Sequence, residues 1–497
     1  MQSQRKLLWG TLTLTSAALA SRGLGLLYRM LLARFLGAEG LGVFQMIFPL
    51  YVALVTLAVA GTPVAVSQMV AEGRREARSL VRLATAIVLA VSIPLMLIVY
   101  VWARPLALTL YHDSRFVPLL WAIAPALLAV AFSAVLRGYF IGLQRVEVPA
   151  ASQVAEQLAR VVIMFAILSM MGRQIPHAPI VAVILIPVGE GVSLMILAWA
   201  YWHNPHLEVV KEGSAVRIYD ILKLSLPVTF SRLLGSLVAV IEATMIPLRL
   251  QASGLSRYAA IQYFGQLTGM ALPLIFFPTA LTLSLATNLV PVVAQAHAQG
   301  DMDTIRRHMV DGMKATALVT VPVTAILLTI GVQLDDLFFH TQIPAMVFVP
   351  LVVGGFFLYF DITLSGILRG LGRTGIPMRN DLIASAVEVF LIWILAARPG
   401  LGAEGVALAL ALGFVLSFAL NLMAALALTR THIGWFSLLA RPALATLPAI
   451  FFTDWWQQWA HLNGWTQVPL LLTSISLATA TYIMAWRLMG VSWRSFT

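Results

Sequence analysis

The feature that most constrains this chain is a series of about fourteen apolar stretches, each near the length of a membrane-spanning helix. Hydrophobic residues make up 60% of its 497 residues and charged residues only 11%, whereas a soluble globular protein is about 25% charged. A helix needs about 20 predominantly apolar residues to cross the hydrocarbon core of a bilayer. The pattern predicts spans at 8–33, 43–67, 80–102, 116–140, 149–171, 178–202, 218–246, 266–292, 314–334, 344–368, 380–397, 403–428, 437–455 and 467–489. We therefore expect an all-α polytopic membrane protein.

The basic residues predict its orientation. If the N-terminus lies in the cytoplasm, the inside loops hold about three times as many Lys and Arg as the outside loops, which is the asymmetry expected of membrane proteins. Arg137 and Arg369 are counted among these inside-loop residues. The net charge of +11 then reflects topology, and we expect no nucleic-acid partner. We expect the first span to be retained rather than cleaved, because Arg22 and Arg29 interrupt its apolar run.

The chain also contains an internal repeat. Ser21–Gly25 (SRGLG) recurs as Ser231–Gly235 (SRLLG), and Leu136-Arg137-Gly138 recurs as Leu368-Arg369-Gly370. Six spans per repeat give both copies the same orientation, so a pseudo-two-fold axis along the membrane normal should relate them. We predict an N-lobe at 1–205 (helices 1–6), a cytoplasmic linker at 206–217, a C-lobe at 218–430 (helices 7–12) and two extra helices at 431–497.

Three arginines within predicted spans are candidates for substrate binding: Arg22, Arg29 and Arg232. A charge deep in a bilayer costs at least ~2.5–3.5 kcal/mol, so an intramembrane arginine is a functional-site hypothesis. Arg22 and Arg29 are seven residues apart and project from one helix face, and Arg232 is the repeat partner of Arg22. Three guanidiniums around a central cavity would suit a diphosphate, which they contact through forked hydrogen bonds. The alternative is that they pair with buried acids or cap helix ends.

A second polar group lies on the fifth span. Glu156 and Arg160 are four residues apart in the favourable Glu-first order, and we favour an internal ion pair over a ligand contact. Gln153 and Gln157 lie on or near the same face and are candidates to line a polar pathway. Glu190, between two glycines of the sixth span, is a weaker candidate.

The second repeat carries acids where the first has none: Glu242, Asp361 and Glu388. They align with Leu32, Ala129 and Arg160. Intramembrane carboxylates are the usual ion or proton sites of pumps and transporters, so we expect an anion-receptive first lobe and a second lobe that binds Na⁺ or a proton. The alternatives are pairing with Arg232 and burial as neutral acids.

The sequence lacks the motifs of common enzymes. It has no cysteine, no GxxxxGK[ST] phosphate loop and no HExxH zinc motif. We expect no enzymatic activity, no metal site and no cofactor, apart from coupling to Na⁺, H⁺ or the membrane potential.

Three segments carry a family resemblance: SRGLGLLYRMLLARFLGAEGLGVFQMIFPLY (21–51), GTPVAVSQMVAEG (61–73) and LRGYFIGLQRVEVPAASQVAEQLAR (136–160). They resemble the polysaccharide-transport and stage V sporulation protein B branch of the multidrug/oligosaccharidyl-lipid/polysaccharide (MOP) flippase superfamily. The opening motif is also similar to that of lipid II flippases. Arg22 and Arg34 match that pattern, whereas Tyr28-Arg29 stands where those proteins tend to have Arg-Asp.

The resemblance implies an alternating-access flippase for an undecaprenyl-diphosphate-linked glycan, either a peptidoglycan precursor such as lipid II or a polysaccharide repeat unit. It implies a multi-pass protein of the plasma membrane with both termini in the cytoplasm. The expected partners are this substrate, the lipid bilayer and candidate envelope-synthesis enzymes, and we expect a monomer. Two alternatives are a cation-coupled multidrug antiporter of the same fold, which should have acids in its first helix, and a non-transporting envelope-synthesis scaffold.

Overall fold

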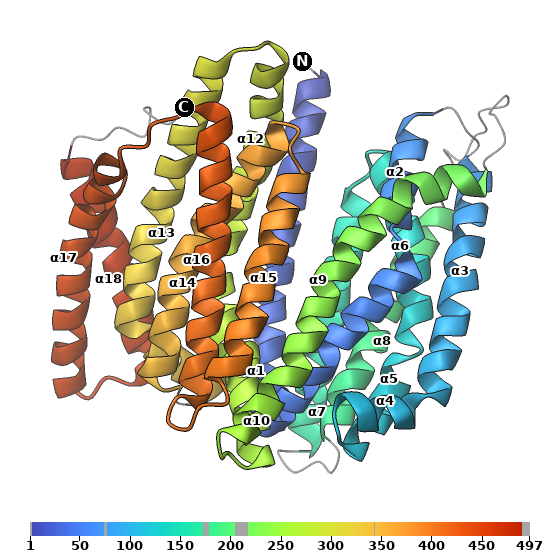
Figure 1. Cartoon of the computed structure of the whole chain (residues 1–497), viewed down its shortest axis with the longest axis horizontal. Coiled ribbons are helices and arrows are strands. Elements are labelled where there is room, and N and C mark those ends of the chain that lie inside the picture. Colours follow the sequence, from blue (N-terminus) through green and yellow to red (C-terminus); the bar gives the residue numbers. More distant parts are fainter. Residues whose placement is uncertain (1, 74–76, 172–177, 204–216, 342, 490–497) are drawn as a thin grey trace. The chain divides into compact units, whose positions relative to one another are not determined.

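The structure is a computed structural model that describes residues 2–73, 77–171, 178–203, 217–341 and 343–489, with side chains at all of these except 2–20, 22, 171 and 437. Within these residues every regular element is a helix (Figure 1). The chain divides into two compact units. Unit 1 comprises Met1–Pro247 and Ile261–Gly265, and unit 2 comprises Leu248–Ala260 and Gln266–Thr497.

Unit 1 contains nine α-helices and one short 3₁₀ helix in the part that the structure describes. Their bounds are α1 (Gln2–Val59), α2 (Thr62–Ala71), α3 (Ala77–Val101), α4 (Ala103–Leu110), η1 (Ser114–Phe116), α5 (Val117–Ile123), α6 (Ala126–Gly142), α7 (Glu147–Met171), α8 (Ala178–Trp202) and most of α9 (Ile218–Ala252).

Unit 2 holds the remaining helices of the described chain. They are α10 (Arg257–Gln266, whose residues 261–265 cluster with unit 1), the π-helix η2 (Leu267–Ala271), α11 (Leu272–Phe276), α12 (Thr279–Ala298), α13 (Met302–Phe339), α14 (Ala345–Gly370), α15 (Gly375–Leu395), α16 (Gly402–Thr429), α17 (Trp435–Leu462) and α18 (Gln467–Leu488).

The predicted fold class is confirmed, because each predicted span coincides with a helix or a short series of helices. Twelve helical segments of the described residues are long and apolar enough to cross a membrane. The first two predicted spans count as one of these because α1 runs through both, and the eighth counts as two. α15 and α17 fall outside the twelve. α15 carries three charged residues within 21 positions: Arg379, Asp381 and Glu388.

Two glycines divide the long N-terminal helical region. Gly37 interrupts α1 with φ 67° and ψ −179°, a conformation that is essentially restricted to glycine. Gly61, with φ 64°, separates α1 from α2, and a Cβ at this position would collide with the Ser225 carbonyl oxygen of α9. The first predicted span therefore ends at Gly37, and the second bends at Gly61.

Each unit repeats one close helix contact. In unit 1, Gly138 of α6 packs against α2, and a Cβ there would lie 2.6 Å from the Pro63 carbonyl oxygen. In unit 2, Gly370 of α14 packs against α12, where a Cβ would lie 2.9 Å from the Val290 carbonyl oxygen. Both glycines belong to the repeated Leu-Arg-Gly sequence. The duplication read from the sequence is therefore also present in the packing of each unit.

The core of unit 2 lies among α12, α13, α14, α16 and α17 (Figure 1). It contains a methionine and aromatic cluster that includes Met309, Met313, Phe360 and Phe418. A smaller cluster joins α13, α17 and α18 through Leu318, Ala449 and Tyr482, so the two extra C-terminal helices pack onto α13. The predicted lobe boundary falls at 206–217, which lies almost wholly outside the described residues, and the lobe limits stay a prediction.

The glycine contact gives a stability prediction. Gly138→Val should lower the stability of the folded protein by about 1–3 kcal/mol, the usual cost of overpacking, because a side chain at this position must displace the α2 backbone. Gly191→Ala is the matched control, since a Cβ there meets nothing within 4 Å. Thermal unfolding of the detergent-purified proteins measures both. Equal melting temperatures for Gly138→Val and the wild type would contradict this packing.

Candidate functional site

A buried cluster of four charges joins three helices of unit 1. The Arg137 guanidinium of α6 donates a 3.0 Å hydrogen bond to Glu156 of α7 and a 3.5 Å bond to Glu190 of α8. It also donates a 2.8 Å bond to the Ser193 hydroxyl. Arg160 of α7 lies 2.8 Å from Glu156 and 3.7 Å from Glu190. The two arginines and two glutamates alternate, so the cluster is neutral as a whole.

Local sequence makes room for this cluster. A Cβ at Gly189 would collide with the Arg160 Nε and lie 2.9 Å from its Cγ, so only glycine lets this arginine lie flat against α8. The side chains of Glu156 and Arg160 are only 8% and 12% exposed. The favoured ion pair of the sequence analysis is therefore present, and two further charges complete it.

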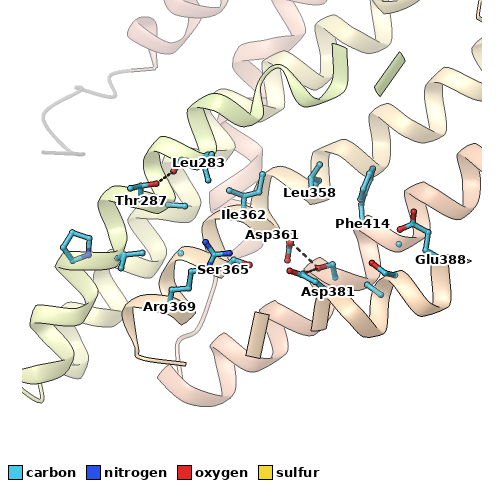
Figure 2. Close-up of a pocket in the computed structure, with 18 residues that line it drawn as sticks. Leu283, Thr287, Leu358, Asp361, Ile362, Ser365, Arg369, Asp381, Glu388 and Phe414 are labelled. Carbon is cyan, nitrogen blue, oxygen red and sulfur yellow. Dashed lines mark hydrogen bonds between the residues drawn. The ribbon is translucent and has the colours of Figure 1, made fainter. Parts of the chain in front are cut away.

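Unit 2 contains a cavity of about 540 Å³ between α12, α14, α15 and α16 (Figure 2). Its charged lining residues are three carboxylates and one guanidinium: Asp361, Asp381, Glu388 and Arg369. The rest of the lining is apolar or carries small hydroxyl side chains, such as those of Thr287, Ser365, Ser385 and Ser417. In Figure 2, Asp361 and Asp381 lie side by side between Arg369 and Glu388. The pocket thus has an excess of two negative charges if all four groups are ionised.

The two aspartates meet at a single hydroxyl. The Ser417 Oγ lies 2.7 Å from the Asp381 Oδ1 and 3.3 Å from the Asp361 Oδ2, and its one proton can serve only one of them. Asn421 donates a 2.7 Å bond to the other oxygen of Asp361 and is itself held by Asn380. Two carboxylates this close repel each other unless a proton or a cation is shared between them.

Glu388 occupies the position in unit 2 that Arg160 occupies in unit 1. A Cβ at Gly413 would collide with the Glu388 carboxylate, just as a Cβ at Gly189 would collide with Arg160. The sequence alignment of Arg160 with Glu388 is therefore supported by a matching glycine on the next helix. The same position thus carries a cationic side chain in unit 1 and an anionic side chain in unit 2.

The predicted anion-binding arginines differ from those of the cluster. Arg22 lies in the helical backbone of α1, but its side chain is outside the described residues. Arg29 is half-buried on α1, and Arg232 is exposed on α9 in the same unit. The guanidinium groups of Arg29 and Arg232 make no hydrogen bond or ion pair with another described side chain, whereas those of Arg137 and Arg160 each pair with two glutamates. The assignment of all three to one cavity stays a prediction.

The remaining predicted residues are not all brought together. Gln153 is exposed and Gln157 half-buried on α7, and neither belongs to the charge cluster. Asp361 and Glu388 line one pocket, but Glu242 is half-buried on α9 in unit 1 and does not line it. Their roles in coupling stay predictions.

Sequence reasoning missed three residues of these sites. Arg137 and Arg369 were placed in inside loops, but α6 extends to Gly142 and α14 to Gly370. Because helical side chains lean toward the N-terminus, each arginine points back along its own helix. Asp381 was overlooked although it lies within the predicted span 380–397. The repeated Leu-Arg-Gly sequence was the available signal for both arginines.

No group of three or more His, Cys, Asp or Glu side chains among the described residues is arranged to hold a metal ion.

Comparison with known proteins identifies the family. The family model for polysaccharide biosynthesis proteins matches residues 7–297, and a MatE model matches residues 267–394. Stage V sporulation protein B of Bacillus subtilis (strain 168) is 31% identical over 428 residues, which cover 83% of this chain and 82% of that protein. The chain belongs to the polysaccharide biosynthesis protein family. The resemblance seen in the three sequence segments is confirmed.

Solved structures share the fold of this family member. The inward closed conformation of a lipid II flippase, MurJ, aligns with a TM-score of 0.72 at 15% identity, over 96% of this chain and 98% of that one. An inward-facing multidrug resistance MATE transporter of the MOP superfamily aligns with a TM-score of 0.67 at 16% identity, over 82% of this chain and 94% of that one. The chain is therefore a multi-pass membrane protein of the polysaccharide biosynthesis family, and it has the fold of MOP-superfamily transporters.

The charge cluster gives a second prediction. Arg160→Gln should destabilise the protein by about 3–5 kcal/mol, because it leaves two buried carboxylates with one counter-ion. Arg145→Gln is the matched control. Its pair with Glu147 is exposed, and such surface pairs contribute about 0–1 kcal/mol. Unfolding in detergent should separate the two variants clearly, and a similar small shift in both would argue against a buried cluster.

Proposed function

We propose that this transporter moves an undecaprenyl-diphosphate-linked glycan, such as a peptidoglycan precursor or a polysaccharide repeat unit, across the plasma membrane by alternating access. The family assignment and the likeness in fold to a lipid II flippase support a lipid-linked substrate. The protein acts as a monomer with both termini in the cytoplasm, without enzymatic activity or a bound cofactor, and it serves envelope-synthesis enzymes.

The observation that carries this proposal is the state of Arg29. It is a half-buried guanidinium within the apolar helix α1, and no described side chain neutralises it. A charge in such a place is costly unless it is paired. Arg137 and Arg160 show that arginines with a purely structural role in this protein are paired with acidic side chains. A diphosphate matches the planar fork of arginine. Arg22, Arg29 and Arg232 therefore bind the diphosphate.

The acidic pocket of unit 2 supplies the coupling. Asp361 and Asp381 share one serine hydroxyl, and Glu388 faces the same cavity. A Na⁺ ion or a proton would relieve the repulsion between the carboxylates. Binding and release of this cation bias the equilibrium between the two access states, and Glu242 on α9 acts with them.

A cation-coupled organic-cation antiporter is the second candidate. The MatE match over residues 267–394 and the excess of acids in the 540 Å³ pocket both favour it. The unpaired Arg29 argues against it, because a cationic substrate gains nothing from a guanidinium on α1. Uptake of a fluorescent organic cation into proteoliposomes, with an outward Na⁺ or proton gradient, would reveal this activity directly.

Complementation tests the proposed substrate. The wild-type gene should rescue a bacterial strain depleted of its lipid II flippase, and Arg22→Ala or Arg29→Ala should not. The loss of one charged hydrogen-bond partner costs about 1.5–3 kcal/mol, or roughly 10- to 100-fold in affinity.

Arg104→Ala is the control for this experiment, since Arg104 is an exposed residue of α4. Immunoblots should show equal membrane insertion of all variants. Failure of the wild type to rescue would assign the protein to another lipid-linked polymer. Rescue by every variant would overturn the role of the arginines.

Cation binding is tested separately on purified protein. If Na⁺ binds the pocket, replacing choline by Na⁺ should stabilise the wild type, by about 2.7 kcal/mol at a hundred times the dissociation constant. If the ion is a proton, acidification should do so instead. Asp361→Asn and Asp381→Asn should lose the gain, and Asp454→Asn, an exposed acid of α17, should keep it. The same gain in all four proteins would exclude this pocket as the site.

A further inference from the structure

Units 1 and 2 each carry one arginine at the same point of the repeated fold. Arg137 lies five residues before the end of α6, and Arg369 lies one residue before the end of α14. Both stand in the Leu-Arg-Gly sequence whose glycine packs on α2 or α12. The next two helices of each unit also match, because Gly189 lies under Arg160 as Gly413 lies under Glu388. The two arginines therefore occupy equivalent positions, and their surroundings can be compared.

Their side chains adopt opposite arrangements. In unit 1, Arg137 is inserted between Glu156 and Glu190 and also contacts the Ser193 hydroxyl, and its side chain is only 22% exposed. In unit 2, Arg369 lines the acidic pocket but is exposed, and its guanidinium makes no hydrogen bond or ion pair with the described residues. Unit 1 therefore shows the arginine of this repeated position in contact with its acidic neighbours, and unit 2 shows the equivalent arginine away from them.

An equivalent serine in each unit has a different hydrogen-bond partner. Ser193 of α8 accepts a hydrogen bond from Arg137. Ser417 of α16, four residues after Gly413 as Ser193 is four after Gly189, donates instead to Asp381. A serine hydroxyl can do either. The site of unit 2 thus retains the group that would receive an incoming guanidinium.

Arg369 lines the same pocket as the two aspartates. α14 and α15 are antiparallel neighbours joined by residues 371–374, so Asp381 lies a short way into the membrane from the level of Arg369. Side chains of α14 lean toward its N-terminus, which is the direction of both Asp381 and Asp361. Figure 2 shows Arg369 extending from the end of α14 toward Ser365 and the aspartates.

We propose that Arg369 is a tethered cation that competes with the coupling cation for Asp361 and Asp381. This inference rests on the proposed coupling at the acidic pocket and adds its regulation. With Na⁺ bound between the carboxylates, the Arg369 guanidinium lies away from them. When Na⁺ leaves, Arg369 folds onto the aspartates as Arg137 does onto its glutamates, and no buried carboxylate pair is left without a counter-ion.

This competition would let the transporter change conformation when no cation is bound in the acidic pocket. Two neighbouring carboxylates without a counter-ion are costly to enclose. The Arg369 guanidinium neutralises them whenever the transporter returns without a bound ion. Because the side chain is attached to α14, its effective concentration at the carboxylates is limited, and a free ion can displace it. Arg369 is thus a positioning and competing residue, and it contacts no lipid-linked substrate.

Arginine labelling tests the movement. Purified full-length protein is treated with phenylglyoxal in Na⁺ or in choline at equal ionic strength, and modification of individual arginines is followed by peptide mass spectrometry. Arg369 should label faster in Na⁺ than in choline. In Asp381→Asn it should label rapidly in both. Arg373, an exposed arginine of the turn after α14, is the internal control and should label at one rate throughout.

Affinity provides the second readout. Arg369→Gln should bind Na⁺ roughly 5- to 150-fold more tightly than the wild type, the usual range of the coupling between two competing binding events. Arg369→Lys should bind with an affinity between them, and Arg373→Gln should match the wild type. If Arg369 acted only through long-range electrostatic repulsion, its removal would also raise the affinity for Na⁺. In that case, however, the labelling rate of Arg369 in the wild type would not depend on Na⁺.

The outcomes separate the two proposals. If Na⁺ stabilises the wild type and Arg369 labels at the same rate with and without it, competition by Arg369 is wrong and the cation site stands. If Na⁺ neither stabilises the wild type nor changes any labelling rate, Na⁺ coupling at this pocket is wrong and the competition falls with it.

Discussion

The structure depends on how each charge buried among its apolar helices is neutralised. A guanidinium or carboxylate removed from water is tolerated only with a partner. In unit 1 the partner is another side chain, as in the neutral cluster of Arg137, Glu156, Arg160 and Glu190. Arg29 has no such partner among the described residues. The charges that are left without side-chain partners are therefore the ones that point to ligands.

Duplication explains why two opposite sites exist in one chain. The same glycine contact places Arg160 against α8 in unit 1 and Glu388 against α16 in unit 2. With the opposite charge at this repeated position, and with aspartates on α14 and α15, unit 2 has an acidic pocket where unit 1 has a self-neutralised cluster. This difference between the repeats is the asymmetry that the proposed coupling of an anionic substrate to a cation requires.

Apolar spacing and repeated motifs were sufficient to predict the helices and their duplication, because those depend on local sequence. The pair of Glu156 and Arg160 was predictable for the same reason, since both lie on one helix. Its partners Arg137 and Glu190 come from other helices, and only tertiary packing brings them together. Asp381 lies within the predicted span 380–397, but its place in a site depends on Ser417 of another helix, which spacing along the chain does not show. The break at Gly37 falls in the gap between the first two predicted spans, although the sequence did not show that one helix would continue on both sides of it.

The central claim is that Arg22, Arg29 and Arg232 bind a diphosphate while the acidic pocket binds the coupling cation. Its most direct test is translocation of a fluorescent undecaprenyl-diphosphate-linked disaccharide in proteoliposomes, with Na⁺ and proton gradients imposed one at a time. We expect the wild-type protein to translocate the lipid faster when one of these gradients is present than when both are absent. We expect Arg29→Ala to lose translocation under either gradient, and Asp381→Asn to lose the response to the gradient. Wild-type translocation that ignores both gradients, or that survives in Arg29→Ala, would contradict the account.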